Sequence, residues 1–159
     1  MTLPRTWIDW GGHRWLALLA RLYLGGLFLW AAVHKIADPA AFALDVATYQ
    51  FLPLAAINAF ALVLPWVEVL AGVMLVAGLR VRSAALLVAL MMAAFLVALG
   101  HALHLGLDLS CGCFASGGAE ADPISWRTLV RDGAWLLLAL YVLAVDRRPL
   151  GVERWGKDS

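Results

Sequence analysis

The sequence predicts an all-α membrane protein, a polytopic four-helix bundle with a short interfacial helix after the first span. Hydrophobic residues make up 64% of the 159 residues and charged residues only 14%, whereas soluble domains contain about 25% charged residues. Four apolar runs each approach the roughly 20 residues that a membrane-spanning helix needs. These runs are continuous rather than alternating, which indicates helices and not the strands of a barrel. The net charge is only +1 and no basic patch is interleaved with aromatic residues, so nucleic acid is not an expected partner.

The first span is predicted at about residues 15–36, after an interfacial segment over residues 1–14. The run is too long for the core of a signal peptide and no clear cleavage site follows it, so we expect the span to be retained. Asp38 and Pro39 then provide a typical helix cap and first-turn residue. The stretch that follows, residues 40–51, mixes apolar and polar residues and predicts a short helix lying in the membrane interface.

The other three spans are predicted at about residues 56–79, 83–103 and 128–145. Residues 80–82 leave only a very short turn between the second and third spans, so these two helices should form an antiparallel pair. Small residues are frequent in the spans and allow helices to approach closely. The expected organisation is therefore an interfacial segment, a membrane domain embedded in the lipid bilayer and a cytoplasmic tail: residues 1–14, 15–146 and 147–159.

The distribution of Lys and Arg predicts the orientation in the membrane. One side carries Lys35, Arg127 and Arg131. The other side carries many more basic residues: Arg5, Arg14, Arg80, Arg82, Arg147, Arg148, Arg154 and Lys157. Since basic loops stay in the cytoplasm, both termini should be cytoplasmic. Residues 104–126 should then face the periplasm of a bacterial inner membrane.

Cys111 and Cys113 are the only two cysteines, and they lie in this outward loop as Cys-Gly-Cys-Phe. The loop would be in an oxidising compartment, where disulfides form and persist. A disulfide between residues so close in sequence is constrained, and strained, exposed disulfides are typically labile or catalytic. The pattern therefore predicts thiol–disulfide chemistry. Two independent buried thiols, a structural clip and a metal-binding pair are the alternatives.

Four ionisable residues fall in or at the ends of the predicted spans. Glu68 lies about halfway along the second span, where an ionisable side chain is costly and indicates a functional site. Lys35, Arg131 and Asp132 lie near the outer ends of the first and fourth spans. Together these groups are expected to form a polar cluster beneath the cysteine loop, in which a cation favours the reactive thiolate. A structural clamp that holds the bundle together is the alternative, and Asp132 would then orient Arg131.

Histidines and aromatic residues near the outer half of the bundle are candidate ligand-binding groups. His101 and His104 share one helix face and could hydrogen-bond a quinone carbonyl. With the two cysteines they could instead bind zinc or copper, although we predict no metal site. Trp30, Tyr49 and Trp66 could wall a flat ligand such as a quinone. Anchoring at the membrane interface is the alternative role for such aromatic residues.

Several short motifs, taken in order, resemble the DoxX-like and MauE-like membrane proteins. The resemblance covers roughly residues 16–146. Its motifs are Leu27-Phe28-Leu29-Trp30, His34-Lys35-Ile36-Ala37-Asp38-Pro39, Tyr49-Gln50-Phe51-Leu52-Pro53 and Pro65-Trp66-Val67-Glu68 with Gly72. The Cys111-Gly112-Cys113-Phe114 motif, followed by Ser125-Trp126 and Val130-Arg131-Asp132, indicates the MauE branch. The resemblance implies a four-helix membrane protein that helps to form disulfides in the small subunit of methylamine dehydrogenase, with a thioredoxin-like partner.

The same resemblance extends to quinone-linked redox proteins. DoxX relatives are linked to thiosulfate–quinone oxidoreduction, and the design is also similar to vitamin K epoxide reductase. This chain differs in having one cysteine pair instead of two, so a separate thioredoxin-like protein must complete the relay.

The function predicted is that of a membrane thiol–disulfide oxidoreductase. It would exchange disulfides with a periplasmic thioredoxin-like protein and use a membrane quinone, ubiquinone or menaquinone, as cofactor. Cys111 and Cys113 would exchange electrons, Lys35 and Arg131 would stabilise a thiolate or quinol anion, and Glu68 would transfer protons. The alternatives are a non-enzymatic assembly factor for a periplasmic partner and a metal-handling or transport protein.

Overall fold

The computed structural model describes residues 11–50, 52–105 and 126–146. These residues form helices and contain no strand: α1 (Gly11–Ala37), α2 (Pro39–Thr48), α3 (Leu54–Ala77), α4 (Val81–His104) and α5 (Trp126–Val145). Four of them are long and apolar enough to cross a membrane, α1 through its part Trp15–Ala37. The predicted all-α fold class, with four apolar spans and a short helix after the first, is confirmed.

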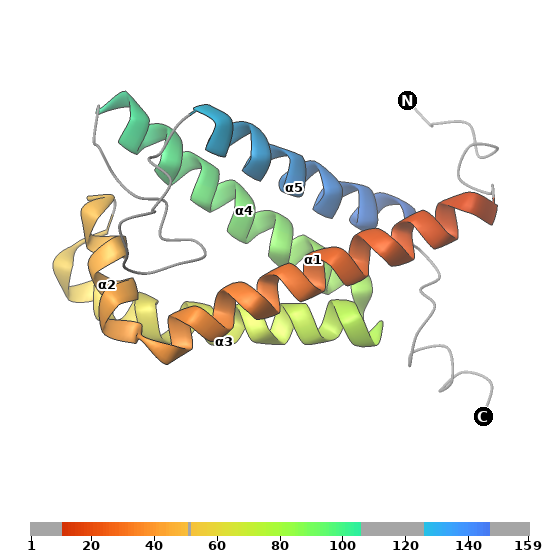
Figure 1. Ribbon diagram of the computed structural model, residues 1–159, viewed down its shortest axis with the longest axis horizontal. Coiled ribbons are helices and arrows are strands. Elements are labelled where there is room, and N and C mark those ends of the chain that lie inside the picture. The colour runs from red at the N-terminus through yellow and green to blue at the C-terminus, as the bar shows by residue number, and fades with distance from the viewer. Residues whose placement is uncertain (1–10, 51, 106–125, 147–159) are drawn as a thin grey trace.

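The four long helices lie side by side as a bundle (Figure 1). α1 packs chiefly against α3 and α4 chiefly against α5, while α1 also contacts α5 and α3 contacts α4. At one end of the bundle, here named the α2 end, α1 and α4 finish, α3 and α5 begin, and α2 packs chiefly against α3. At the other end, named the turn end, residues 78–80 join α3 to α4, with Gly78 and Arg80 in the left-handed conformation.

The short helix α2 is held at its start by a capping hydrogen bond. The Asp38 side chain accepts from the backbone N–H of Ala41 at 2.9 Å, and Pro39 occupies the first helical position, as the sequence predicted. The helix ends at Thr48, three residues before the end of the stretch predicted for it. Gln50 then adopts a left-handed conformation with φ 50°, which a helix cannot continue through.

The core at the turn end is closely packed around small residues. Gly25 of α1 and Gly72 of α3 face each other, and a Cβ on either would lie 3.0 Å from the other's carbonyl oxygen. The two backbones can approach this closely because neither residue has a side chain. The buried residues around this contact come from all four long helices: Ala20, Leu24, Phe28, Ala71, Leu75, Val81, Ala84, Ala85, Val88, Ala89, Met92, Ala139 and Val142.

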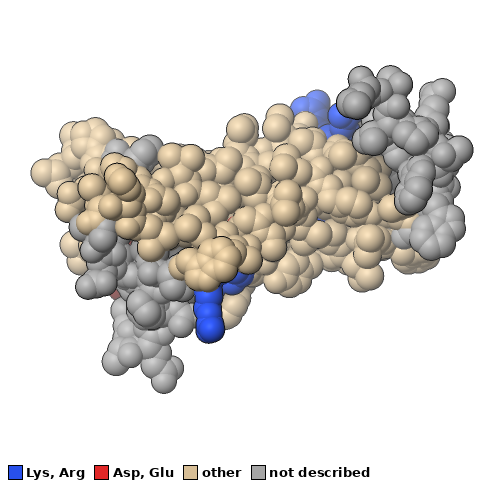
Figure 2. Space-filling view, turned by 90° about the horizontal axis from the view of Figure 1, so that it is seen from above, with Lys and Arg blue, Asp and Glu red and all other residues tan. Residues whose placement is uncertain are grey.

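The outer surface of the bundle is apolar. Large hydrophobic side chains such as Leu19, Val63 and Leu137 are more than half exposed. Figure 2 shows one long face on which nearly all described atoms belong to uncharged residues, with Lys and Arg in two small groups only. Such a surface would be unfavourable in water over this area and matches a hydrocarbon environment, which agrees with the four candidate spans.

Candidate functional site

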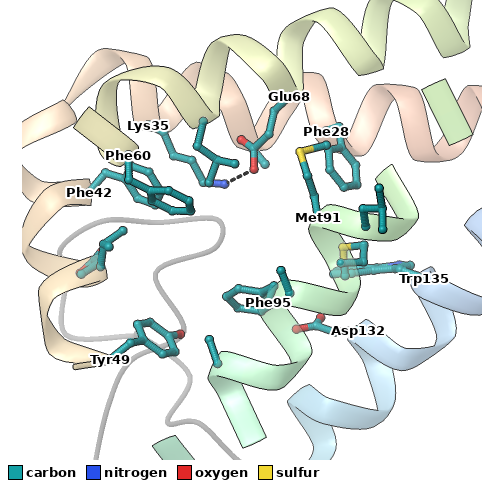
Figure 3. Close-up of a pocket in the computed structure, with 18 of the residues that line it drawn as sticks. Phe28, Lys35, Phe42, Tyr49, Phe60, Glu68, Met91, Phe95, Asp132 and Trp135 are labelled. Atoms are coloured by element: carbon teal, nitrogen blue, oxygen red, sulfur yellow. Dashed lines mark hydrogen bonds and ion pairs between the residues drawn. The ribbon is translucent and has the colours of Figure 1, made fainter. Parts of the chain in front are cut away.

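A cavity of about 420 Å³ lies between the helices in the half of the bundle nearer the α2 end. Its wall includes residues from all five described helices, and most of them are apolar. Figure 3 shows the aromatic and methionine side chains that surround it. The volume and the apolar lining with few polar groups are typical of small-molecule sites. The aromatic lining residues are Phe28, Phe42, Tyr49, Phe60, Phe95 and Trp135.

An ion pair lies in the wall of this cavity. Lys35, two residues before the end of α1, donates from Nζ to Oε1 of Glu68 in the middle of α3, at 2.6 Å. The two residues are only 7% and 6% exposed, so each charge depends on the other for compensation. The Lys35 ammonium also lies 5.1 Å from the centroid of the Phe42 ring. The residues Lys35 and Glu68, predicted to belong to one polar cluster, are thus in direct contact.

Asp132 of α5 brings a second carboxylate to the cavity. Its side chain is 1% exposed, and Oδ1 accepts a hydrogen bond from Arg131 Nε at 3.1 Å. Arg131 is itself partly exposed and lies over the ring of Trp135, 4.9 Å from guanidinium carbon to centroid. Asp132 lines the cavity, whereas Arg131 does not. The acid is therefore the member of this pair that a bound molecule would meet.

Glu68 and Asp132 each have, in the cavity wall, a carboxylate oxygen without a hydrogen-bond partner among the residues that the structure describes. These atoms, Oε2 of Glu68 and Oδ2 of Asp132, are buried. Buried polar atoms are normally hydrogen-bonded, so an exception in a cavity wall indicates a ligand or a transferred proton. Figure 3 shows Glu68 on the α3 side and Asp132 on the α5 side, with Met91 and Phe95 of α4 between them.

The sequence placed Asp132 in the expected polar cluster, with orientation of Arg131 as its alternative role, but did not predict that its carboxylate lines a cavity. A signal for its burial was nevertheless present in the spacing of α5. Thr128, Asp132, Ala139 and Val142 are buried, and Trp135 lines the cavity. These positions are separated by alternating steps of four and three residues, the spacing of one helix face. An acid on that face must point into the bundle.

The other predicted site residues are distributed differently. Tyr49 is buried and lines the cavity. Trp30 and Trp66 are 58% and 63% exposed and are not among the lining residues; Trp30 instead packs edge-on against His34. His101 and His104 are exposed in the last turn of α4. The structure thus brings together Lys35, Glu68 and Tyr49, and leaves the two tryptophans and the histidines outside.

Cys111 and Cys113 lie outside the described residues. α4 ends at His104 and α5 begins at Trp126, both at the α2 end (Figure 1). The chain that carries the cysteines therefore leaves and returns at the end of the bundle nearer the cavity. No group of three His, Cys, Asp or Glu suited to a metal ion occurs in the described ranges.

A second buried ion pair joins α1 to the residue after α5. Arg21 donates to Asp146 Oδ2 at 3.4 Å, and the residues are 2% and 8% exposed. Neither residue lines the cavity. This pair lies toward the turn end, where α5 finishes.

Comparison with known proteins gave two matches. The family model described as methylamine utilisation protein MauE matches residues 13–145. The methylamine utilization protein MauE of Paracoccus denitrificans is 33% identical over 123 residues, which are 77% of this chain and 65% of that protein. The chain thus spans slightly less than two thirds of this relative's length. No solved structure matches.

Proposed function

Since this chain belongs to the MauE family, we propose that it is a membrane thiol–disulfide oxidoreductase in the maturation of a periplasmic enzyme of the methylamine dehydrogenase type. It takes electrons from the thiols of a periplasmic thioredoxin-like partner and delivers them to a membrane quinone. The observation that carries this proposal is the buried Lys35–Glu68 pair in the wall of an aromatic-lined cavity. The cavity lies toward the end of the bundle at which α4 ends and α5 begins, the two helices between which the cysteines fall in the sequence.

The first half of the reaction is a disulfide exchange at Cys111 and Cys113. A thiolate of the partner attacks the Cys111–Cys113 disulfide, which forms a mixed disulfide and releases one cysteine thiolate. The partner's second thiolate then breaks the mixed disulfide. The partner leaves with a disulfide, and this chain keeps two reduced cysteines that hold the two electrons.

The second half returns the cysteine pair to its disulfide form. Two electrons and two protons leave the reduced pair, and a quinone supplies the chemistry that accepts both. Residues of the cavity fit such a molecule, because the aromatic walls suit a flat ring and Glu68 Oε2 and Asp132 Oδ2 are buried oxygens without hydrogen-bond partners in the described part of the chain. Lys35 would hold an oxygen of the ring and stabilise negative charge there. Glu68 would carry protons to or from that position.

The experiment that tests this function uses single cysteine variants of the membrane-embedded protein. Cys111→Ser and Cys113→Ser should each abolish quinone reduction by a reduced thioredoxin-like protein, since neither can form the disulfide. One of them should accumulate a mixed disulfide, detected on non-reducing gels. Ser110→Ala, beside the pair but without a thiol, is the matched control and should keep wild-type turnover.

The opposite result would favour a non-enzymatic assembly factor. If both cysteine variants still support maturation of the periplasmic enzyme at the wild-type level, the pair is a static clip. The bundle would then act by docking the partner.

A further inference from the structure

The two ends of the cavity differ in the hydrogen bonds that they offer. On the α1–α3 side, Lys35 has three ammonium hydrogens, of which one is donated to Glu68 Oε1. That side therefore offers donors from Lys35 and an acceptor at Glu68 Oε2. On the α5 side, Asp132 presents Oδ2, while its other oxygen already accepts from Arg131. An ionised carboxylate only accepts hydrogen bonds.

We propose that Asp132 makes this cavity selective for the reduced, hydroxyl-bearing form of the quinone over the oxidised form. The proposal rests on the proposed function, because it concerns the molecule that the cavity takes there. A ring with oxygens on opposite sides would meet Lys35 and Glu68 with one oxygen and Asp132 with the other. This assigns Asp132 a binding role that the sequence alone did not indicate.

The selectivity follows from which group can donate a hydrogen bond. A quinol hydroxyl at the α5 side donates to Asp132 Oδ2 and satisfies a buried acceptor. A quinone carbonyl there has no hydrogen to donate, so two acceptors face each other and the carboxylate stays unsatisfied. An unsatisfied buried group keeps its full desolvation penalty, which is larger when the group is charged. The α1–α3 side discriminates less between the two forms, because Lys35 can donate to a quinone carbonyl and Glu68 can accept from a quinol hydroxyl.

Such selectivity would adjust the driving force of the reaction. In the proposed direction, two cysteine thiols become a disulfide while quinone gains two electrons and two protons to become quinol. A site that binds quinol more tightly than quinone raises the two-electron potential of the bound couple. A tenfold preference corresponds to about 30 mV. Asp132 would thereby favour disulfide formation without contacting a cysteine.

The test measures equilibrium binding of a short-chain ubiquinone and of its quinol. The full chain is reconstituted in nanodiscs under anaerobic conditions, and each form is titrated by calorimetry. The quinol should bind at least tenfold more tightly than the quinone. Asp132→Asn should bring the ratio to within about twofold of one, because an amide both donates and accepts. Asp146→Asn, the same change at a buried carboxylate that does not line the cavity, should keep the wild-type ratio.

The outcomes separate this inference from the proposed function. Equal binding of the two forms, or tighter binding of the quinone, overturns the role of Asp132 even if the cysteine pair still reduces quinone. A wild-type preference that persists in Asp132→Asn also overturns it. If neither form binds, the quinone step of the proposed function fails together with this inference. Should Asp132→Asn fold poorly, Asp132→Ser, which also supplies a donor and an acceptor, should show the same loss of preference.

Discussion

Two pairs of a buried cation and a buried carboxylate occur within residues 11–50, 52–105 and 126–146, and their surroundings differ. Arg21 and Asp146 meet toward the turn end at 3.4 Å, and neither lines the cavity. Lys35 and Glu68 meet at 2.6 Å in the wall of a cavity of about 420 Å³, where one oxygen of Glu68 lacks a partner in the described part of the chain. Both pairs join residues that are distant in sequence.

The difference between the pairs shows that burial of charge does not by itself identify a functional site. Any buried ion pair costs desolvation energy and depends on its partner. At the turn end, small residues such as Gly25 and Gly72 let the helices close around the core. Near the α2 end, aromatic residues line a cavity between the helices. Space next to the Lys35–Glu68 pair is what allows a ligand to reach it.

Removing one member of each pair should give the largest effects. Lys35→Met and Arg21→Met each leave a buried carboxylate without its cation, so each should lower the free energy of unfolding by about 3 to 5 kcal/mol. Titration with sodium dodecyl sulfate in mixed micelles measures this loss. Quinone affinity, measured on the fraction that remains folded, should fall at least tenfold for Lys35→Met and stay unchanged for Arg21→Met.

Double variants give the control for this prediction. Replacing both partners of a buried pair by apolar residues is often neutral or stabilising, so Lys35→Met with Glu68→Met should recover stability but not quinone binding. Arg21→Met with Asp146→Leu should recover stability and keep binding. Equal loss of binding in both double variants would contradict the functional distinction between the two pairs.

A pair of substitutions on α4 tests the difference in packing. Ala85 is fully buried in the core, whereas Ala98 lines the cavity. Ala85→Leu should lower the free energy of unfolding by about 1 to 3 kcal/mol because no space is available for the added atoms. Ala98→Leu should change stability by less than about 1 kcal/mol and weaken quinone binding by filling the cavity. The same unfolding and binding measurements check both variants, and equal destabilisation would be evidence against an accessible cavity.

The smallest expected effect concerns the N-terminal cap of α2. Phe42, Asp45 and Val46 of this helix, and Tyr49 directly after it, line the cavity. Asp38→Ala removes the hydrogen bond to Ala41 N–H and should cost about 1 kcal/mol. Hydrogen exchange of the α2 amides should then be faster, while α5 exchanges as before. Asp38→Asn caps a helix equally well and should leave the exchange unchanged.

Much of the fold could be predicted from the sequence because its signals are local. Apolar runs of span length indicated the long helices, and Asp38-Pro39 indicated where the short helix begins. The end of that helix was predicted three residues too late, since the left-handed conformation of Gln50 has no clear signature in a non-glycine residue.

The candidate site was predicted only in part. Glu68 and Lys35 were identified because a charge in an apolar run needs compensation, and the structure places them in contact. The place of Asp132 in the cavity wall was not predicted, because Arg131, its neighbour in sequence, already offered a partner for the carboxylate. The exposure of Trp30 and Trp66 depends on how the helices are rotated, and aromatic residues near an interface give no clear indication of that rotation.

The three-residue turn between α3 and α4 has a consequence for biogenesis. Helices joined so closely are expected to enter the bilayer together as a hairpin. Glu68 belongs to α3, the first helix of this hairpin. Synthesis proceeds from the N-terminus, so α1 is already made at that time. Lys35 lies two residues from the end of α1, where a long side chain can keep its ammonium near the interface. Lys35 is therefore already in place when Glu68 is inserted, so the Glu68 carboxylate does not enter the bilayer without a counter-ion.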